Sequence, residues 1–145
     1  MINTNKLKQD INDRFILIAP DGGSLKKIYK LAEQIGYKGD IITCSKDRNV
    51  DGTIKHFHIT GGELPENKDI IIIDDICDGG LTFIETANQI KDYLGDTRKG
   101  KIYLIVTHSI FSKGTDELLK YFDGIYTTNS YKEHNVEKIK VLNIF

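Results

Sequence analysis

Four consecutive isoleucines, Ile70 to Ile73, constrain the fold of this 145-residue chain more than any other feature. A strand with one face in water alternates apolar and polar residues, whereas an unbroken apolar run is typical of a strand covered on both faces. Such strands belong to parallel sheets that have helices on each side. The run is also far too short to cross a bilayer. It therefore predicts a buried strand, over residues 69–75, in an α/β fold.

Apolar runs and helical patterns alternate along the rest of the chain, as they do in parallel α/β folds. Five central strands are predicted at 15–19, 41–44, 69–75, 101–107 and 124–128, with a weaker strand at 54–59 and a last or edge strand within 136–144. We expect one three-layer domain over 1–145, with a mainly parallel, twisted sheet of about five strands flanked by helices. Residues 1–13 would form an N-terminal extension.

Helices are predicted between these strands. The first begins at Leu25, carries Lys26, Lys27 and Lys30 on the face opposite its apolar side, and stops near Gly36. Two more are predicted from about Leu81 and at 115–122.

Charge and cysteine content exclude several classes of protein. The 20 basic and 21 acidic residues leave a formal net charge of −1, so no global field directs the chain to nucleic acid or to a membrane. Cys44 and Cys77 match no zinc spacing, and we expect buried thiols rather than a disulfide. No signal peptide is predicted. We expect a soluble, cytoplasmic protein that binds neither nucleic acid nor membrane.

Polar loops follow four of the predicted strands. They are residues 20–24, 45–48, 74–82 and 107–109. In a parallel α/β sheet, ligands bind beyond the carboxyl ends of the strands, where such loops converge. We therefore expect a ligand site at this edge of the sheet.

The segment 74–82 carries the most specific chemistry. Gly79 and Gly80 let the backbone approach a ligand closely, and the helix that starts near Leu81 presents unpaired N–H groups that favour a phosphate. Asp74 and Asp75 favour hydroxyls or a metal instead, so a sugar phosphate would satisfy both ends. Alternatively, the glycines form only a tight turn and the aspartates cap the helix. Two adjacent carboxylates at the end of a buried strand are costly without a partner, which favours the ligand site.

Several segments together resemble a known family. Residues 71–83, Ile-Ile-Ile-Asp-Asp-Ile-Cys-Asp-Gly-Gly-Leu-Thr-Phe, resemble the ribose-phosphate-binding signature of type I phosphoribosyltransferases. Further segments resemble the C-terminal half of the ribose-phosphate pyrophosphokinase (PRPP synthetase) family and follow in the same order as there. These segments are residues 19–23, the pair Lys46 and Arg48, residues 107–112 and residues 127–129. The similarity runs from about Phe15 to the C-terminus.

The resemblance implies a role for each matching residue. It implies a ribose-phosphate site whose carboxylates bind the sugar hydroxyls and whose amides bind the 5-phosphate, formed by Asp74, Asp75, Asp78, Gly79, Gly80, Leu81 and Thr82. It implies pyrophosphate binding by Asp21, Gly22 and Gly23, with Asp21 as the ligand of Mg²⁺. Lys46 and Arg48 would be catalytic and would neutralise charge on the transferring group. His108 is a further candidate.

The residues also leave alternatives open. Lys46 and Arg48 lie in a polar stretch, 45–53, that is also compatible with a solvated loop. Asp21 is a candidate helix cap, and His108 a structural residue. His56 and His58 share one strand face, where an exposed face is favoured over a metal pair because no third ligand is evident.

Two departures from the family limit what the resemblance implies. The family has two similar halves in tandem, and this chain is about half that length. Leu81 and Ser109 stand where the family usually has glycine.

The resemblance implies an enzyme of nucleotide metabolism that makes or consumes PRPP (5-phosphoribosyl pyrophosphate). Its ligands would be ribose 5-phosphate or PRPP with Mg²⁺, and ATP is a candidate second substrate. We expect a homo-oligomer or pairing with a similar domain. The alternative is a non-catalytic ribose-phosphate- or nucleotide-binding module that partners a full-length synthetase. A phospho-receiver domain is disfavoured, because neither Ala19 nor Cys44 supplies an acceptor aspartate.

Overall fold

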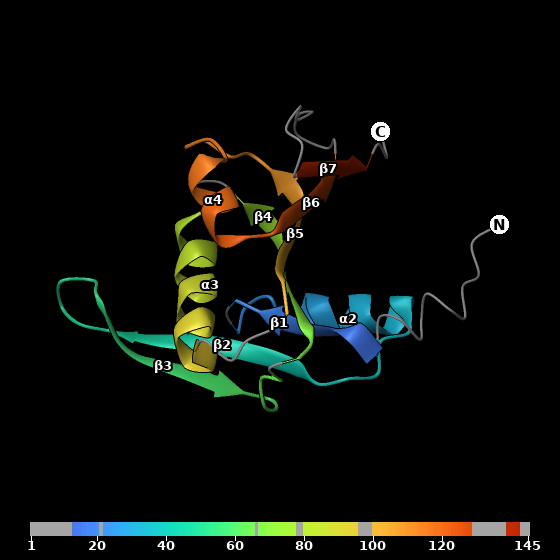
Figure 1. The fold of residues 1–145 in the computed structure, drawn as a ribbon, viewed down its shortest axis with the longest axis horizontal. Coiled ribbons are helices and arrows are strands. Elements are labelled where there is room, and N and C mark those ends of the chain that lie inside the picture. The colour runs from blue at the N-terminus through green and yellow to red at the C-terminus, as the bar shows by residue number, and fades with distance from the viewer. Residues whose placement is uncertain are drawn as a thin grey trace.

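A computed structural model describes residues 13–20, 22–65, 67–77, 80–95, 100–128 and 139–142 (Figure 1). Strands and helices alternate along most of this part of the chain. In chain order they are β1 (Phe15–Ala19), α2 (Leu25–Ile35), β2 (Ile41–Arg48), β3 (Ile54–Thr60), β4 (Asp69–Cys77), α3 (Leu81–Leu94), β5 (Ile102–Ser109), α4 (Asp116–Tyr121), β6 (Gly124–Thr128) and β7 (Ile139–Leu142).

The described strands form one seven-stranded sheet in the order β3-β2-β1-β4-β5-β6-β7. Every neighbouring pair is parallel except β2 and β3, which are antiparallel. The predicted α/β class with a mainly parallel sheet is confirmed. The sheet has two strands more than the five that were expected as central, because β3 and β7 add to its two edges.

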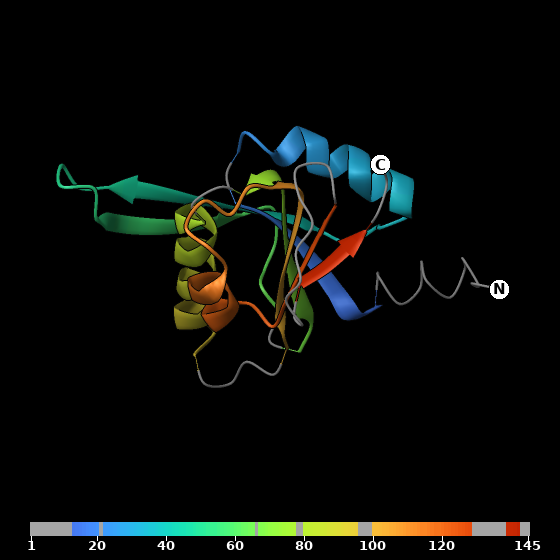
Figure 2. The same cartoon turned by 90° about the horizontal axis from the view of Figure 1, so that it is seen from above.

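The isoleucine run occupies the middle of this sheet and is covered on both sides. Ile70 and Ile72 belong to the larger core cluster, which contains residues of α3 and α4. Ile73 belongs to a second cluster, which includes Ile28 of α2, and Ile71 packs against it. Figure 2 shows α2 on one side of the sheet and α3 with α4 on the other. The alternation of side chains along β4 thus divides one apolar run between two cores.

The strand order places a topological switch point between β1 and β4. From β1 the chain passes to β2 and β3 on one side, and it returns to β4 on the other side of β1. Ligands of open α/β sheets bind outside the carboxyl ends of the strands at such a point. The last residue of β4 that pairs with β1 is Ile72, so Asp74 and Asp75 lie beyond the end of that ladder.

The β2–β3 hairpin extends β2 further than the sequence predicted. β3 pairs with β2 as far as Arg48, so residues 45–48 are strand and not the solvated loop that their polarity allowed. At the tip, the N–H of Asn49 donates to the carbonyl of Thr53 at 2.8 Å. In Figure 1 the hairpin runs out past α3, away from the body of the sheet.

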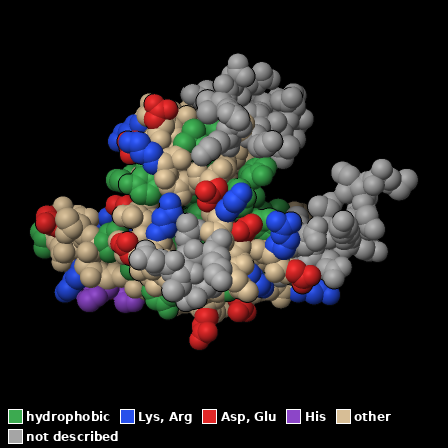
Figure 3. All heavy atoms as spheres, in the orientation of Figure 1, with side chains coloured by type: hydrophobic (Ala, Val, Ile, Leu, Met, Phe, Trp, Pro, Cys, Tyr) green, Lys and Arg blue, Asp and Glu red, His purple; other side chains and the backbone are tan. Residues whose placement is uncertain are grey.

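The state of the cysteines and the distribution of surface charge agree with what the composition predicted. Cys44 and Cys77, both within the described residues, are buried and form no disulfide. On the face shown in Figure 3, basic and acidic side chains are interspersed. Among the described helices, none is both long and apolar enough to cross a membrane.

Candidate functional site

Helix α3 begins at Leu81, as predicted, and points its N-terminus toward the end of β4. Its N-cap, Gly80, has φ 86°, which is left-handed backbone that glycine adopts most easily. A Cβ there would also lie 3.0 Å from the Leu118 side chain. The helix has no side-chain cap and no acidic residue in its first turn. Its first N–H groups therefore keep the partial positive charge that attracts an anion.

Other members of the predicted phosphate loop are less constrained. Leu81 is 63% exposed, and Thr82 is exposed as well. Asp78 and Gly79 lie outside the described residues, so their predicted contacts with a phosphate stay predictions.

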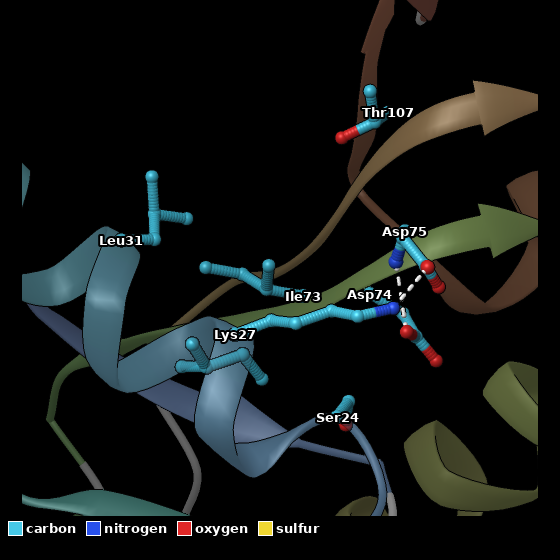
Figure 4. Close-up of a pocket in the computed structure, with 8 residues that line it drawn as sticks. Ser24, Lys27, Leu31, Ile73, Asp74, Asp75 and Thr107 are labelled. Atoms are coloured by element: carbon cyan, nitrogen blue, oxygen red, sulfur yellow. Dashed lines mark hydrogen bonds and ion pairs between the residues drawn. The ribbon is translucent and has the colours of Figure 1, made fainter.

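The two aspartates of β4 are half-buried and already hold polar partners. The N–H of Asp75 donates to Asp74 Oδ1 at 2.8 Å. Lys27 Nζ on α2 donates to Asp75 Oδ2 (Figure 4). The hydrogen bond from Lys27 holds the pKa of Asp75 below its ordinary value, although burial opposes this effect. The same hydrogen bond raises the pKa of Lys27, so both groups are charged at neutral pH.

A cavity of about 190 Å³ opens beside this ion pair. Its wall combines apolar side chains of α2 and β4 with a polar rim, and consists of Ser24, Lys27, Ile28, Leu31, Ile73, Asp74, Asp75 and Thr107. Side chains that come from β4, β5 and the start of α2 thus meet at the switch point. A cavity with an apolar wall and a few convergent charged groups is the usual form of a small-molecule site.

Lys27 is the residue of this cavity that sequence reasoning missed. Its helical spacing assigned it to the outer face of α2, yet its side chain reaches across the sheet edge to Asp75 (Figure 4). One signal could have identified it. Lys27 lies in the first turn of the helix that follows β1, and that turn starts at the same edge of the sheet as the end of β4.

The predicted pyrophosphate loop lies between β1 and α2. Gly22 and Gly23 are exposed, and a Cβ at Gly22 would meet no atom within 4 Å. This open space leaves room for a ligand at the Gly22 backbone. Asp21 lies outside the described residues, so its predicted Mg²⁺ and pyrophosphate roles stay predictions.

The structure does not bring Lys46 and Arg48 into the cavity. Strand alternation points both toward α3, where Lys46 Nζ donates to Thr86 Oγ1 at 2.8 Å. Arg48 binds the Glu85 carboxylate, with its closer N–O distance at 2.6 Å. The hydrogen bond from Arg48 lowers the pKa of Glu85. Both cations thus lie along the second turn of α3 and not in the cavity that Asp75 lines.

The histidines do not form a metal centre in the described part of the chain. His108 is exposed on β5 and does not line the cavity, whereas its neighbour Thr107 does. His58 Nε2 lies 2.9 Å from Asp47 Oδ2, and His56 is exposed on the same strand. No group of three or more potential metal ligands occurs among the described residues. His56 and His58 thus lie on an exposed strand face, as expected.

The fit of Mg²⁺ to this site depends on oxygen donors. Asp74 and Asp75 supply the hard oxygen ligands that Mg²⁺ prefers. They are only two, however, and the Lys27 ammonium already neutralises one of them. Within the described residues, a bound Mg²⁺ would therefore need further oxygens from water or from the ligand.

The family of the chain follows from comparison with known proteins. The chain belongs to the phosphoribosyl transferase domain family, whose model matches residues 2–140. Among curated proteins, it is similar to the ribose-phosphate pyrophosphokinase of Thermosipho africanus, with 29% identity over 99% of this chain and 44% of that protein. The ribose-phosphate pyrophosphokinase of Thermotoga maritima is 27% identical over 96% of this chain and 42% of its own length. The chain thus spans less than half the length of these relatives.

Solved structures support the fold. The phosphoribosylpyrophosphate synthetase of Mycobacterium smegmatis superposes with a TM-score of 0.69 at 19% identity, over 97% of this chain and 45% of that chain. An APRTase from Giardia lamblia gives a TM-score of 0.53 at 15% identity, over 91% of this chain and 78% of that chain. The predicted resemblance to type I phosphoribosyltransferases, and to one half of the pyrophosphokinases, is confirmed.

Proposed function

We propose that this chain binds a 5-phosphoribosyl substrate, ribose 5-phosphate or PRPP, together with Mg²⁺, and catalyses pyrophosphoryl or phosphoribosyl transfer. One observation carries the proposal. The half-buried Asp74–Asp75 pair leads directly, at the switch point of the sheet, to the glycine-capped N-terminus of α3. Carboxylates accept hydrogen bonds from sugar hydroxyls, and a helix N-terminus binds phosphate.

In this proposal each group has a separate task. Asp74 and Asp75 orient the ribose diol, and the amides at the start of α3 hold the 5-phosphate. Gly22 and Gly23 receive pyrophosphate oxygens, and Asp21 is the candidate ligand for Mg²⁺, which would supply positive charge for those oxygens. Because Arg48 and Lys46 are held by α3, they must turn from Glu85 and Thr86 before either can contact a transferring group.

The second substrate and the assembly belong to the same proposal. ATP is the candidate pyrophosphoryl donor, because the curated relatives are ribose-phosphate pyrophosphokinases. The chain covers 44% of the first of these relatives. We therefore propose that a second copy, or another similar domain, completes the site in a homo-oligomer or a mixed assembly.

A non-catalytic module is the second candidate function. The engagement of Lys46 and Arg48 with α3 favours it, because the two candidate catalytic cations are bound to the protein itself. Such a module would hold a ribose phosphate or a nucleotide and partner a full-length synthetase. It would keep its ligand affinity when both cations are removed.

Phosphorus NMR on the purified chain with Mg²⁺, ribose 5-phosphate and ATP tests both candidates. Formation of PRPP and AMP, abolished in Lys46→Ala but kept in the matched hairpin control Lys55→Ala, supports the enzyme. Broadening of the ribose 5-phosphate signal without turnover, relieved by Asp75→Asn, supports the binding module. Absence of both turnover and broadening contradicts the ribose-phosphate site.

A further inference from the structure

Lys27 extends from the first turn of α2 to the carboxylate pair of β4 (Figure 4). Its ammonium donates to Asp75 Oδ2, and Asp74 adds to the negative field around it. The Lys27 side chain is 65% exposed and that of Asp75 is 41% exposed. The pair therefore faces the solvent-accessible cavity and is open to a ligand.

This geometry gives the carboxylate pair a positive partner that belongs to the chain. Two adjacent carboxylates repel each other and need a nearby cation to stay ionised together. One oxygen of Asp74 accepts the N–H of Asp75, and one oxygen of Asp75 accepts Lys27. A divalent cation that bound Asp75 Oδ2 would have to displace an ammonium or share the oxygen with it. An ammonium also has three donors, so Lys27 can bind Asp75 and an anionic ligand at once.

We propose that Lys27 occupies the cation position at the Asp74–Asp75 pair, competes with divalent metal for Asp75, and lets a phosphorylated sugar bind there without metal. Lys27 is a positioning residue in this scheme: it holds Asp75 toward the sugar hydroxyls and presents a positive charge to the ligand's anionic groups. The part of the proposal that concerns the sugar rests on the proposed function. The part that concerns competition with metal does not.

Manganese alone tests the competition. Mn²⁺ binding to the ligand-free chain is measured by electron paramagnetic resonance for the wild type and for Lys27→Met. We expect Mn²⁺ to bind Lys27→Met about tenfold more tightly, because a like charge next to the metal has been removed. Lys30→Met, which removes an exposed lysine of the same helix, is the matched control and should bind as the wild type does. Equal Mn²⁺ affinity in the wild type and in Lys27→Met would overturn the proposal.

Three further variants separate charge from structure. Adding Asp75→Asn to Lys27→Met should remove the gain in Mn²⁺ affinity, because the metal loses its carboxylate. Lys27→Arg, which keeps the positive charge, should retain weak Mn²⁺ binding. Should Lys27→Met fail to fold, Lys27→Gln provides the neutral variant, and circular dichroism checks each protein first.

Ribose 5-phosphate tests the consequence for the ligand. Its dissociation constant is measured by calorimetry in EDTA and in Mg²⁺. For the wild type, we expect the dissociation constant in EDTA to differ from that in Mg²⁺ by less than about twofold. For Lys27→Met, we expect the dissociation constant to rise at least tenfold in EDTA and to recover in Mg²⁺, since an ion pair contributes on the order of a tenfold change. An equal dependence on Mg²⁺ in both proteins would overturn the proposal. If neither protein binds the sugar in any buffer, the proposed function fails, and the Mn²⁺ comparison still decides the competition.

Discussion

Arg48 on β2 holds the carboxylate of Glu85 on α3 through two contacts, with N–O distances of 2.6 and 3.3 Å. The guanidinium also donates to the carbonyl of Gly52 at 2.9 Å, within its own hairpin. Lys46 adds a parallel contact to Thr86. These contacts tie the β2–β3 hairpin to the helix whose N-terminus is the predicted phosphate site. They also determine where the two candidate catalytic cations rest in this structure.

Removal of Glu85 should release the hairpin. Side chains of Arg48 and Glu85 are 42% and 20% exposed, so solvent screens the pair and its contribution to stability is small. We expect Glu85→Ala to have a slightly lower free energy of unfolding than the wild type. We also expect trypsin to cleave its hairpin faster. Glu117→Ala removes a more exposed ion pair within α4, with Lys120, and is the control. Equal hairpin cleavage in the two variants would contradict the prediction.

The same pair should make stability depend on pH in the acid range. Arg48 holds the pKa of Glu85 below its ordinary value, so the folded state binds this proton less readily than the unfolded state does. The contribution is therefore fully present above about pH 5, past the unfolded pKa of about 4.3, and is lost as the pH falls through the folded pKa. Urea unfolding of the wild type and of Glu85→Gln should show a difference in the free energy of unfolding that narrows as the pH falls from about pH 5 to pH 3. A difference that widens on acidification would contradict a lowered pKa of Glu85 in the folded state.

Gly80→Ala should destabilise the chain and weaken phosphate binding. The residue has φ 86°, where an L side chain costs about 1–2 kcal/mol, and the new Cβ would press on Leu118. We expect urea unfolding to show a loss of this size in the free energy of unfolding. We also expect phosphorus NMR to show less broadening of the ribose 5-phosphate signal. Gly22→Ala is the control for stability, because its Cβ would meet open space, and we expect a change within about 0.5 kcal/mol. Equal losses in both variants would show that Gly80 has no special backbone requirement.

The two cysteines should resist modification in the folded protein. Burial raises the pKa of Cys44 to about 12, and Cys77 is buried too. The thiolate is the reactive form, so at pH 8 we expect slow reaction with a disulfide reagent in native buffer and rapid labelling of two thiols in urea. The readout is the absorbance of the released thiol. Rapid labelling in native buffer would place a cysteine at an accessible site.

Local patterns of the sequence were sufficient for the elements and for their class. The four isoleucines require cover on both faces, and the period of apolar residues separates strands from helices without any tertiary contact. Gly36 has φ 76° and ends α2 where the sequence predicted a stop. The carboxyl-edge position of Asp74 and Asp75 followed as well, because parallel strands present their carboxyl ends at one edge.

Only the tertiary structure decided which side chains meet at that edge. Lys27 and Asp75 are 48 residues apart, and Arg48 and Glu85 are 37 apart, so no local pattern could pair them. A long side chain can reach several neighbours from one backbone position, and its choice depends on the twist of the sheet and on which helix covers which face. For the same reason β2 continues to Arg48 despite its polar sequence, because β3 supplies the backbone partners. The sequence by itself determined the sheet and its acidic edge, and the packing of α2 and α3 decided which cations lie at each carboxylate.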